Sequence, residues 1–102
     1  MTTKQAKLNF QDTDIKALVL AFLAMKNTSE MQAFLRDLLT ESEIIEFSKR
    51  FRAARSLAKS IHYTAIAEDT GLSSRTIARV KHWFKHGKGG YRIAIARRKS
   101  QS

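Results

Sequence analysis

Hydrophobic residues recur along this chain with the period of an α-helix, and the pattern predicts an all-α fold. Residues 15–25 are apolar on nearly every face, and Asp12 or Thr13 can cap the start of that helix. Residues 31–39 follow as an amphipathic helix, with apolar side chains three and four positions apart. A domain of this size has little interior in which to bury the first helix, so we expect a second subunit to cover part of it.

A third helix is predicted from about Glu41 to Lys59. Thr40 and Glu43 form a capping-box pattern, in which each side chain satisfies a free backbone N–H at the helix start. The helix begins acidic and continues basic, an order that complements the helix dipole. Its apolar positions, which recur at spacings of three and four, are Ile44, Phe47, Phe51, Ala54, Ala58 and Ile61.

The segment from Tyr63 to Phe84 is predicted to be a helix-turn-helix, around which the rest of the chain is organised. Gly71 lies where the chain must turn sharply, because glycine takes a positive φ without steric cost. Ala67 leaves room for the two helices to cross, and Ser73 can cap the second one. The inward-facing positions are Ile66, Thr70, Leu72, Ile77 and Val80, of which Thr70 suits an apolar site least well.

The second helix of this motif has short polar and long basic side chains on the face opposite its apolar positions. These residues are Ser74, Arg75, Ala78, Arg79 and His82. In a DNA-binding helix-turn-helix, the N-terminal half of the second helix meets base edges in the major groove. The pattern therefore favours DNA recognition over an ordinary helical hairpin, which would also show apolar residues at these spacings.

The segments flanking the motif are less clearly patterned. His62 precedes the first helix at the N-cap position, where a short hydroxyl or carboxylate side chain is more usual. Gly87 is predicted to be a helix C-cap, and Gly89 and Gly90 a turn. In the basic C-terminal tail, residues 88–102, apolar and polar residues alternate over too short a stretch to assign a structure. The tail could be a strand, a helix or an arm that lies on phosphate.

The net charge of +10 is distributed unevenly over the 102 residues, which are few enough to form a single domain (1–102). Residues 1–47 contain five basic and seven acidic residues, whereas residues 48–102 contain fourteen and two. A basic half of this kind attracts a polyanion. Because no segment combines a basic face with an exposed bulky apolar face, we expect nucleic acid as the partner and no membrane.

Composition and spacing argue against several other classes. The chain has no cysteine, and its first residues lack the apolar stretch of a signal peptide, which predicts a cytoplasmic, nucleoid-associated protein. His82 and His86 have the spacing of a two-histidine metal pair, but no acidic residue follows Asp69 to complete a site. No catalytic motif is visible, so we expect neither enzymatic activity nor a cofactor, and we assign no catalytic or metal-binding residue.

From Leu38 to Arg92 the chain resembles the Trp repressor family, and specifically its YerC/YecD-like branch. The motifs that carry the resemblance are LLT, TGLS, TIARV and GGYR, which are specific in combination. The resemblance implies an all-α, Trp-repressor-like domain that forms an intertwined homodimer, with residues 63–84 as the DNA-binding head. The residues expected to contact DNA are Tyr63, Thr64, Ser73, Ser74, Arg75, Thr76, Ala78, Arg79, His82, Lys85 and Lys88.

The resemblance also bears on a small-molecule effector. In the Trp repressor the indole of tryptophan lies between two arginines that match Arg50 and Arg79, and the capping threonine matches Thr40. Val80 and Trp83 stand where the Trp repressor has glycine and serine, so both add bulk to that pocket. We therefore predict that L-tryptophan is not needed, with Trp83 lying against Arg50 or Arg79 as a built-in substitute. The alternative is that Trp83 packs against the tail near residue 91 and leaves the pocket open to another ligand.

Three functions remain after this reading. The first is a sequence-specific regulator that binds double-stranded DNA as a homodimer and acts as a repressor. The second is a non-specific nucleic-acid or nucleoid accessory protein, because phosphate binding alone would favour the basic half. The third is a protein-interaction adaptor in which the helix-turn-helix is only structural.

Overall fold

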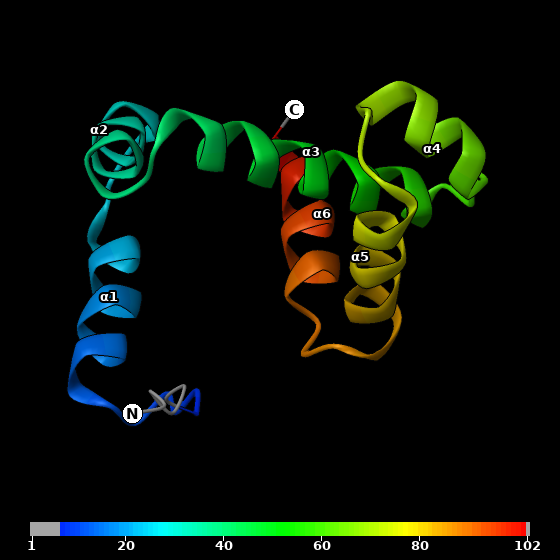
Figure 1. The fold of residues 1–102 in the computed structure, drawn as a ribbon. Helices are drawn as coiled ribbons and strands as arrows, with labels where there is room; N and C mark the ends of the chain where they lie inside the picture. The colour runs from blue at the N-terminus through cyan, green and yellow to red at the C-terminus, as the bar shows by residue number, and fades with distance from the viewer. Residues whose placement is uncertain (1–6, 102) are drawn as a thin grey trace, which may run out of the picture. The chain divides into compact units, whose positions relative to one another are not determined.

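The computed structural model describes residues 7–101, and in that range the chain contains helices and no strands, so the fold is all-α as predicted (Figure 1). The helices are α1 (Thr13–Ala24), α2 (Thr28–Leu38), α3 (Glu41–Ala58), α4 (Tyr63–Thr70), α5 (Ser74–His86) and α6 (Gly90–Gln101). The chain divides after Leu39 into two compact units, which are described in turn. Within the described range no helix is both long and apolar enough to cross a membrane.

The first unit contains α1 and α2, which begin at well-formed caps. Asp12 accepts hydrogen bonds from the backbone N–H groups of Asp14 and Ile15, at 3.0 and 3.1 Å. The rings of Phe22 and Phe34 join the two helices edge to face, with centroids 5.2 Å apart. No residue of α1 is buried, and its most exposed leucines are Leu20, at 62%, and Leu23, at 76%. The apolar surface of α1 thus stays open to solvent in the single chain.

The second unit is built on α3, which begins at the predicted capping box. The backbone N–H of Thr40 donates to Glu43 Oε1 at 2.9 Å, and the backbone N–H of Glu43 donates to Thr40 Oγ1 at 3.1 Å. These hydrogen bonds hold the pKa of the Glu43 carboxyl below its ordinary value. The capping box therefore works through the ionised form of Glu43.

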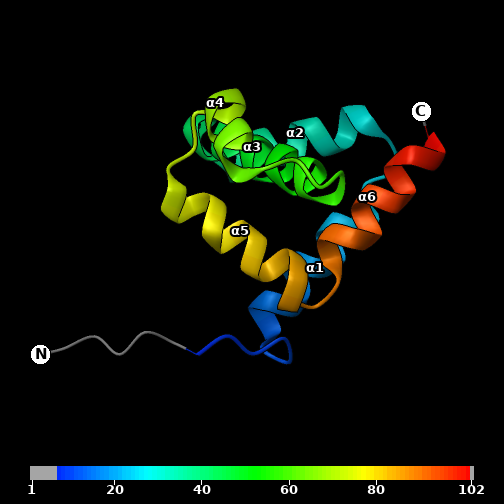
Figure 2. The ribbon, with the colours of Figure 1, turned by 90° about the vertical axis from the view of Figure 1, so that its right-hand side faces the viewer.

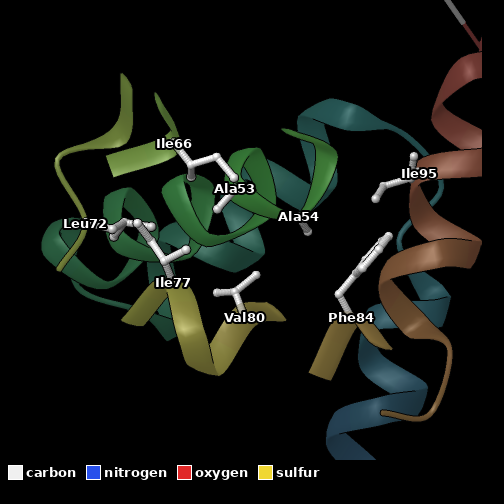
Figure 3. Packing of buried hydrophobic residues seen from close by; sticks show 8 residues of the cluster. All are labelled: Ala53, Ala54, Ile66, Leu72, Ile77, Val80, Phe84 and Ile95. Carbon is white, nitrogen blue, oxygen red and sulfur yellow. The ribbon is translucent and has the colours of Figure 1, made fainter. Parts of the chain in front are cut away.

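The core of this unit gathers where α4 and α5 pack on α3, and Figure 3 shows its side chains converging from these helices. Ala53 and Ala54 have no exposed surface, because small side chains let α5 approach α3 closely. Phe47 and Ile61, which the apolar spacing of α3 placed in its buried stripe, are 45% and 39% exposed. The buried face of α3 is centred on the alanines, and Ile61 lies beyond the end of the helix.

The helix-turn-helix forms as predicted, and all five positions expected to face inward are buried. Gly71 ends α4 with a φ of +73°. Thr70, which seemed poorly suited to its site, donates from Oγ1 to the Ile66 carbonyl at 2.7 Å and accepts from the Leu72 N–H at 3.2 Å. Its hydroxyl thus connects both sides of the turn. His62 does cap α4, because its Nδ1 accepts from the Thr64 N–H at 3.3 Å.

We expect Thr70→Val to lower the free energy of unfolding by about 1–3 kcal/mol, because it leaves the N–H of Leu72 without its buried acceptor. Thr70→Ser keeps the hydroxyl and is the matched control. Urea denaturation of both variants measures the difference. If the valine variant unfolds at the same urea concentration as the parent, the hydroxyl does not stabilise the turn.

The C-terminal tail is a helix, which the sequence had left open. Gly87 ends α5 as predicted, and Gly89 has a φ of +85°, but Gly90 already begins α6 rather than completing a turn. Figure 2 shows α6 running back at an angle from the end of α5. Ile95 is 8% exposed and belongs to the core, and the Arg92 guanidinium lies 4.3 Å from the centre of the Phe84 ring. The tail is therefore a structural part of this unit.

Candidate nucleic-acid interface

The apolar positions of α5 decide which of its faces meets solvent. Ile77, Val80 and Phe84 point into the core toward α3 (Figure 3). The opposite face is exposed, and it carries Ser74, Arg75, Ala78, Arg79 and His82. The face predicted to meet DNA is therefore accessible along the N-terminal two-thirds of α5.

A recess opens at the start of this face, between the beginnings of α4 and α5. It has a volume of about 450 Å³ and is lined by Tyr63, Ser74, Arg75, Ile77, Ala78 and Lys81. Four of these were predicted to contact DNA, and the structure brings them together although Tyr63 belongs to the other helix. The recess thus combines a partly exposed tyrosine ring and small side chains with two cations.

Lys81 was missed by the sequence analysis. It is exposed and lies in the recess wall with Ala78, three positions earlier on α5. That spacing, together with the positive charge, was the available signal, because positions three apart on a helix are neighbours. Lys81 therefore joins the candidate interface.

Three predicted DNA-contacting side chains also have structural hydrogen bonds. Ser73 caps α5 by accepting from the Thr76 N–H at 3.1 Å, and its hydroxyl donates to Thr76 Oγ1 at 3.0 Å. Thr64 Oγ1 lies 2.9 Å from the Nδ1 of His62. These residues fix the starts of α4 and α5, so they position the basic side chains that follow.

An ion pair fastens α4 to the helix beneath it. The Arg52 guanidinium of α3 donates to the Asp69 carboxylate near the end of α4. Only two acidic residues, Glu68 and Asp69, follow residue 47 in the sequence, and this ion pair engages one of them. Neither α5 nor α6 contains an acidic residue, so the exposed face of α5 carries its positive charge without a carboxylate of its own helix.

Lys85 and Lys88 extend the positive surface beyond this face. Both are exposed, Lys85 in the last turn of α5 and Lys88 in the connection to α6. His82 and His86 have ring centroids 5.5 Å apart. Among the described residues no group of three or more histidine, cysteine or acidic side chains could hold a metal ion.

The four residues of the expected ligand pocket are not joined to one another. Thr40 caps α3, while Arg50 pairs with Glu46 at 3.1 Å and lies over the ring of Phe47. Arg79 and Trp83 are both exposed on α5. In the described part of the chain, no side-chain hydrogen bond, ion pair or ring contact links any two of Thr40, Arg50, Arg79 and Trp83.

The predicted contact of Trp83 with Arg50 or Arg79 is not formed within the chain. The indole is 52% exposed and meets the His82 ring edge to face, with centroids 5.3 Å apart. It also lies close to Gly87, where an added Cβ would stand 3.1 Å from its Cε3 atom. Trp83 faces solvent because α5 turns Val80 and Phe84 toward the core instead.

Comparison with known proteins gives consistent matches. The sequence profile described as Trp repressor protein matches residues 13–99. The uncharacterised protein YerC of Bacillus subtilis strain 168 is 34% identical over 84 residues, which cover 82% of this chain and 81% of that protein.

Two solved structures share the fold. A TrpR-like protein from Eubacterium eligens superposes with a TM-score of 0.81 at 34% identity, covering 86% of this chain and 91% of the other. A protein from Staphylococcus aureus, described as a candidate Trp repressor, superposes with a TM-score of 0.82 at 27% identity, covering 91% and 96%. The range matched by the family profile, residues 13–99, includes the helix-turn-helix.

Proposed function

Because the chain belongs to the Trp repressor family, and is thus a DNA-binding regulator in kind, we propose that it binds double-stranded DNA sequence-specifically as a homodimer and represses transcription. The observation that carries the proposal is the exposed face of α5. Ser74, Arg75 and Ala78 stand at the N-terminal half of a helix whose other face is fixed in the core. This is the geometry in which a recognition helix presents side chains to base edges.

The proposal divides the interface by the chemistry of its side chains. Arg75 reads bases, because a guanidinium can donate two hydrogen bonds to guanine in the major groove. Lys85 and Lys88, at the end of α5 and beyond it, contact phosphates and hold the protein in register. Lys81 lies in the wall of the recess, and Arg79 is exposed on α5 outside it, so we assign both long side chains to phosphates or base edges beside the Arg75 contact.

The homodimer is the second part of the proposal. The exposed apolar surface of α1 supports it, since leucines that stay more than half exposed in one chain are suited to burial against another. Two recognition helices related by a two-fold axis would read a palindromic site. The proposal places the dimer on the chromosome, in the cytoplasm.

Equilibrium titration of the full-length protein tests whether it binds DNA at all. We expect a duplex of mixed sequence to be bound with an affinity that falls steeply as salt rises, because each phosphate contact releases counterions. Fluorescence anisotropy at four salt concentrations measures the slope. Failure to bind any duplex at low salt would favour the adaptor, in which the helix-turn-helix is only structural.

We expect neither folding nor DNA binding to require L-tryptophan. Val80 packs in the core, and Arg50, one of the two arginines of the family's pocket, is already engaged by Glu46 and Phe47. Titration calorimetry with L-tryptophan, in the presence and absence of DNA, is the measurement. Micromolar binding, or a DNA affinity that rises with added tryptophan, would show that the pocket still accepts the amino acid.

A further inference from the structure

A second, smaller cavity lies between α3 and α6. Its walls are Arg55, Ala58 and Lys59 from the end of α3, and Ile95 and Arg98 from α6. Its volume is about 130 Å³. It shares no residue with the recess of the candidate DNA interface, so the two are separate sites.

Three cations meet at this cavity without a carboxylate in its wall. Arg55 and Lys59 are four positions apart on α3, a spacing at which like charges repel. The Nε atom of Arg55 is buried and has no hydrogen-bond partner among the described residues. Glu46 and Asp69, two carboxylates of this unit, pair with Arg50 and Arg52 and not with the cations of the cavity.

A buried donor without a partner is unfavourable, and an anion in the cavity would satisfy it. The Arg55 guanidinium also lies over the Phe51 ring, 5.5 Å from its centre, but no carboxylate of the cavity wall balances the three positive charges. Ile95 is 8% exposed, so one wall of the cavity is apolar, which strengthens the attraction between the cations and an anion. The arrangement thus has the donors and the charge of an oxyanion site.

We propose that this cavity binds one phosphate group of a small soluble molecule. With a volume of about 130 Å³, the cavity has room for a tetrahedral oxyanion such as phosphate. Guanidinium groups suit phosphate because they donate several hydrogen bonds in a fixed plane. Lys59 adds a compact point charge to the two arginines.

A phosphate group could also come from the DNA backbone. The free ligand is the better candidate because Arg55 and Ile95 stand partly or largely out of solvent, whereas backbone phosphates are met by exposed side chains. The site belongs to the packing of α6 on α3, and a bound phosphate would join those two helices.

Titration calorimetry of the full-length protein with inorganic phosphate, and separately with pyrophosphate, tests the proposal. We expect binding of at least one of them, and a loss of about tenfold for Lys59→Ala and for Arg98→Ala, the effect of removing one charged hydrogen bond. Both side chains are exposed, so neither change empties the core. Arg97→Ala is the matched control, since it removes the same charge from the residue before Arg98, which does not line the cavity.

Three results would overturn the proposal. One is the absence of binding by phosphate and pyrophosphate, and another is an equal loss in Arg97→Ala and Arg98→Ala, which would indicate only the general positive field. The third is an Arg98→Ala variant that still binds phosphate as the parent does but binds duplex DNA more weakly than Arg97→Ala does. That result would indicate that the cations of the cavity contact the DNA backbone. Circular dichroism checks that each variant is folded, and Arg98→Lys, which keeps the charge, should retain part of the affinity.

Discussion

Replacing Leu20 and Leu23 together by glutamate should convert the full-length protein to a monomer that unfolds without cooperativity. In the proposed dimer these side chains leave water, and exposing two leucines again removes about 3–6 kcal/mol per protomer. Each glutamate would in addition place a carboxylate in an apolar interface, where it must be protonated or paired. Sedimentation equilibrium measures the loss directly.

The control for this change keeps the leucines and introduces two glutamates elsewhere on the same helix. Thr13→Glu with Lys16→Glu places two glutamates on exposed polar positions near the start of α1, where the helix dipole tolerates acidic residues. This variant should remain dimeric. A folded, stable monomer in the unmodified protein would contradict the dimer proposal. If the variant with glutamate at positions 20 and 23 is still a dimer, the interface does not include these side chains of α1.

Arg75→Ala should weaken binding to the preferred duplex by about 1–3 kcal/mol, while affinity for unrelated duplexes changes much less. Arg75 is exposed at the first turn of α5 and lies in the wall of the recess. A bidentate contact from such a position discriminates one base pair from the others, so its loss should also relax the sequence preference there.

Lys88→Ala is the matched comparison because it removes the same charge from the connection after α5. We expect it to weaken preferred and unrelated duplexes alike and to reduce the salt slope by about one. Equal losses on preferred and unrelated DNA for Arg75→Ala would count against base reading by that residue. Deletion of the tail is a poor test of its charge, since it would remove Ile95 from the core.

The parts of the fold that the sequence predicted are those governed by local rules. Caps at Asp12, Thr40 and Ser73 fixed three helix starts, and Gly71 fixed the turn, because each acts within a few residues. The burial of Ile66 and its partners followed from helical spacing alone. The exposed face of α5 then followed as its complement.

Other features depended on contacts that no local pattern contains. Ala53 is fully buried only because α5 crosses α3 at that point, which the spacing of α3 alone does not show. Among its described residues α6 buries only Ile95, so its sequence has no strong amphipathic pattern to recognise. His62 caps α4 through a ring nitrogen, which the usual set of capping side chains does not include. Trp83 is exposed because Val80 and Phe84 occupy the buried face of α5, and the sequence alone did not show which of the two aromatic residues would face the core.

Selection of bound sites from a random duplex library, with the full-length protein at physiological salt, tests the central claim most directly. We expect an enriched palindromic motif whose half-sites lie about one helical turn apart, as two α5 helices in a symmetric dimer would require. Bound DNA without any enriched motif would contradict it and would support the non-specific accessory protein instead.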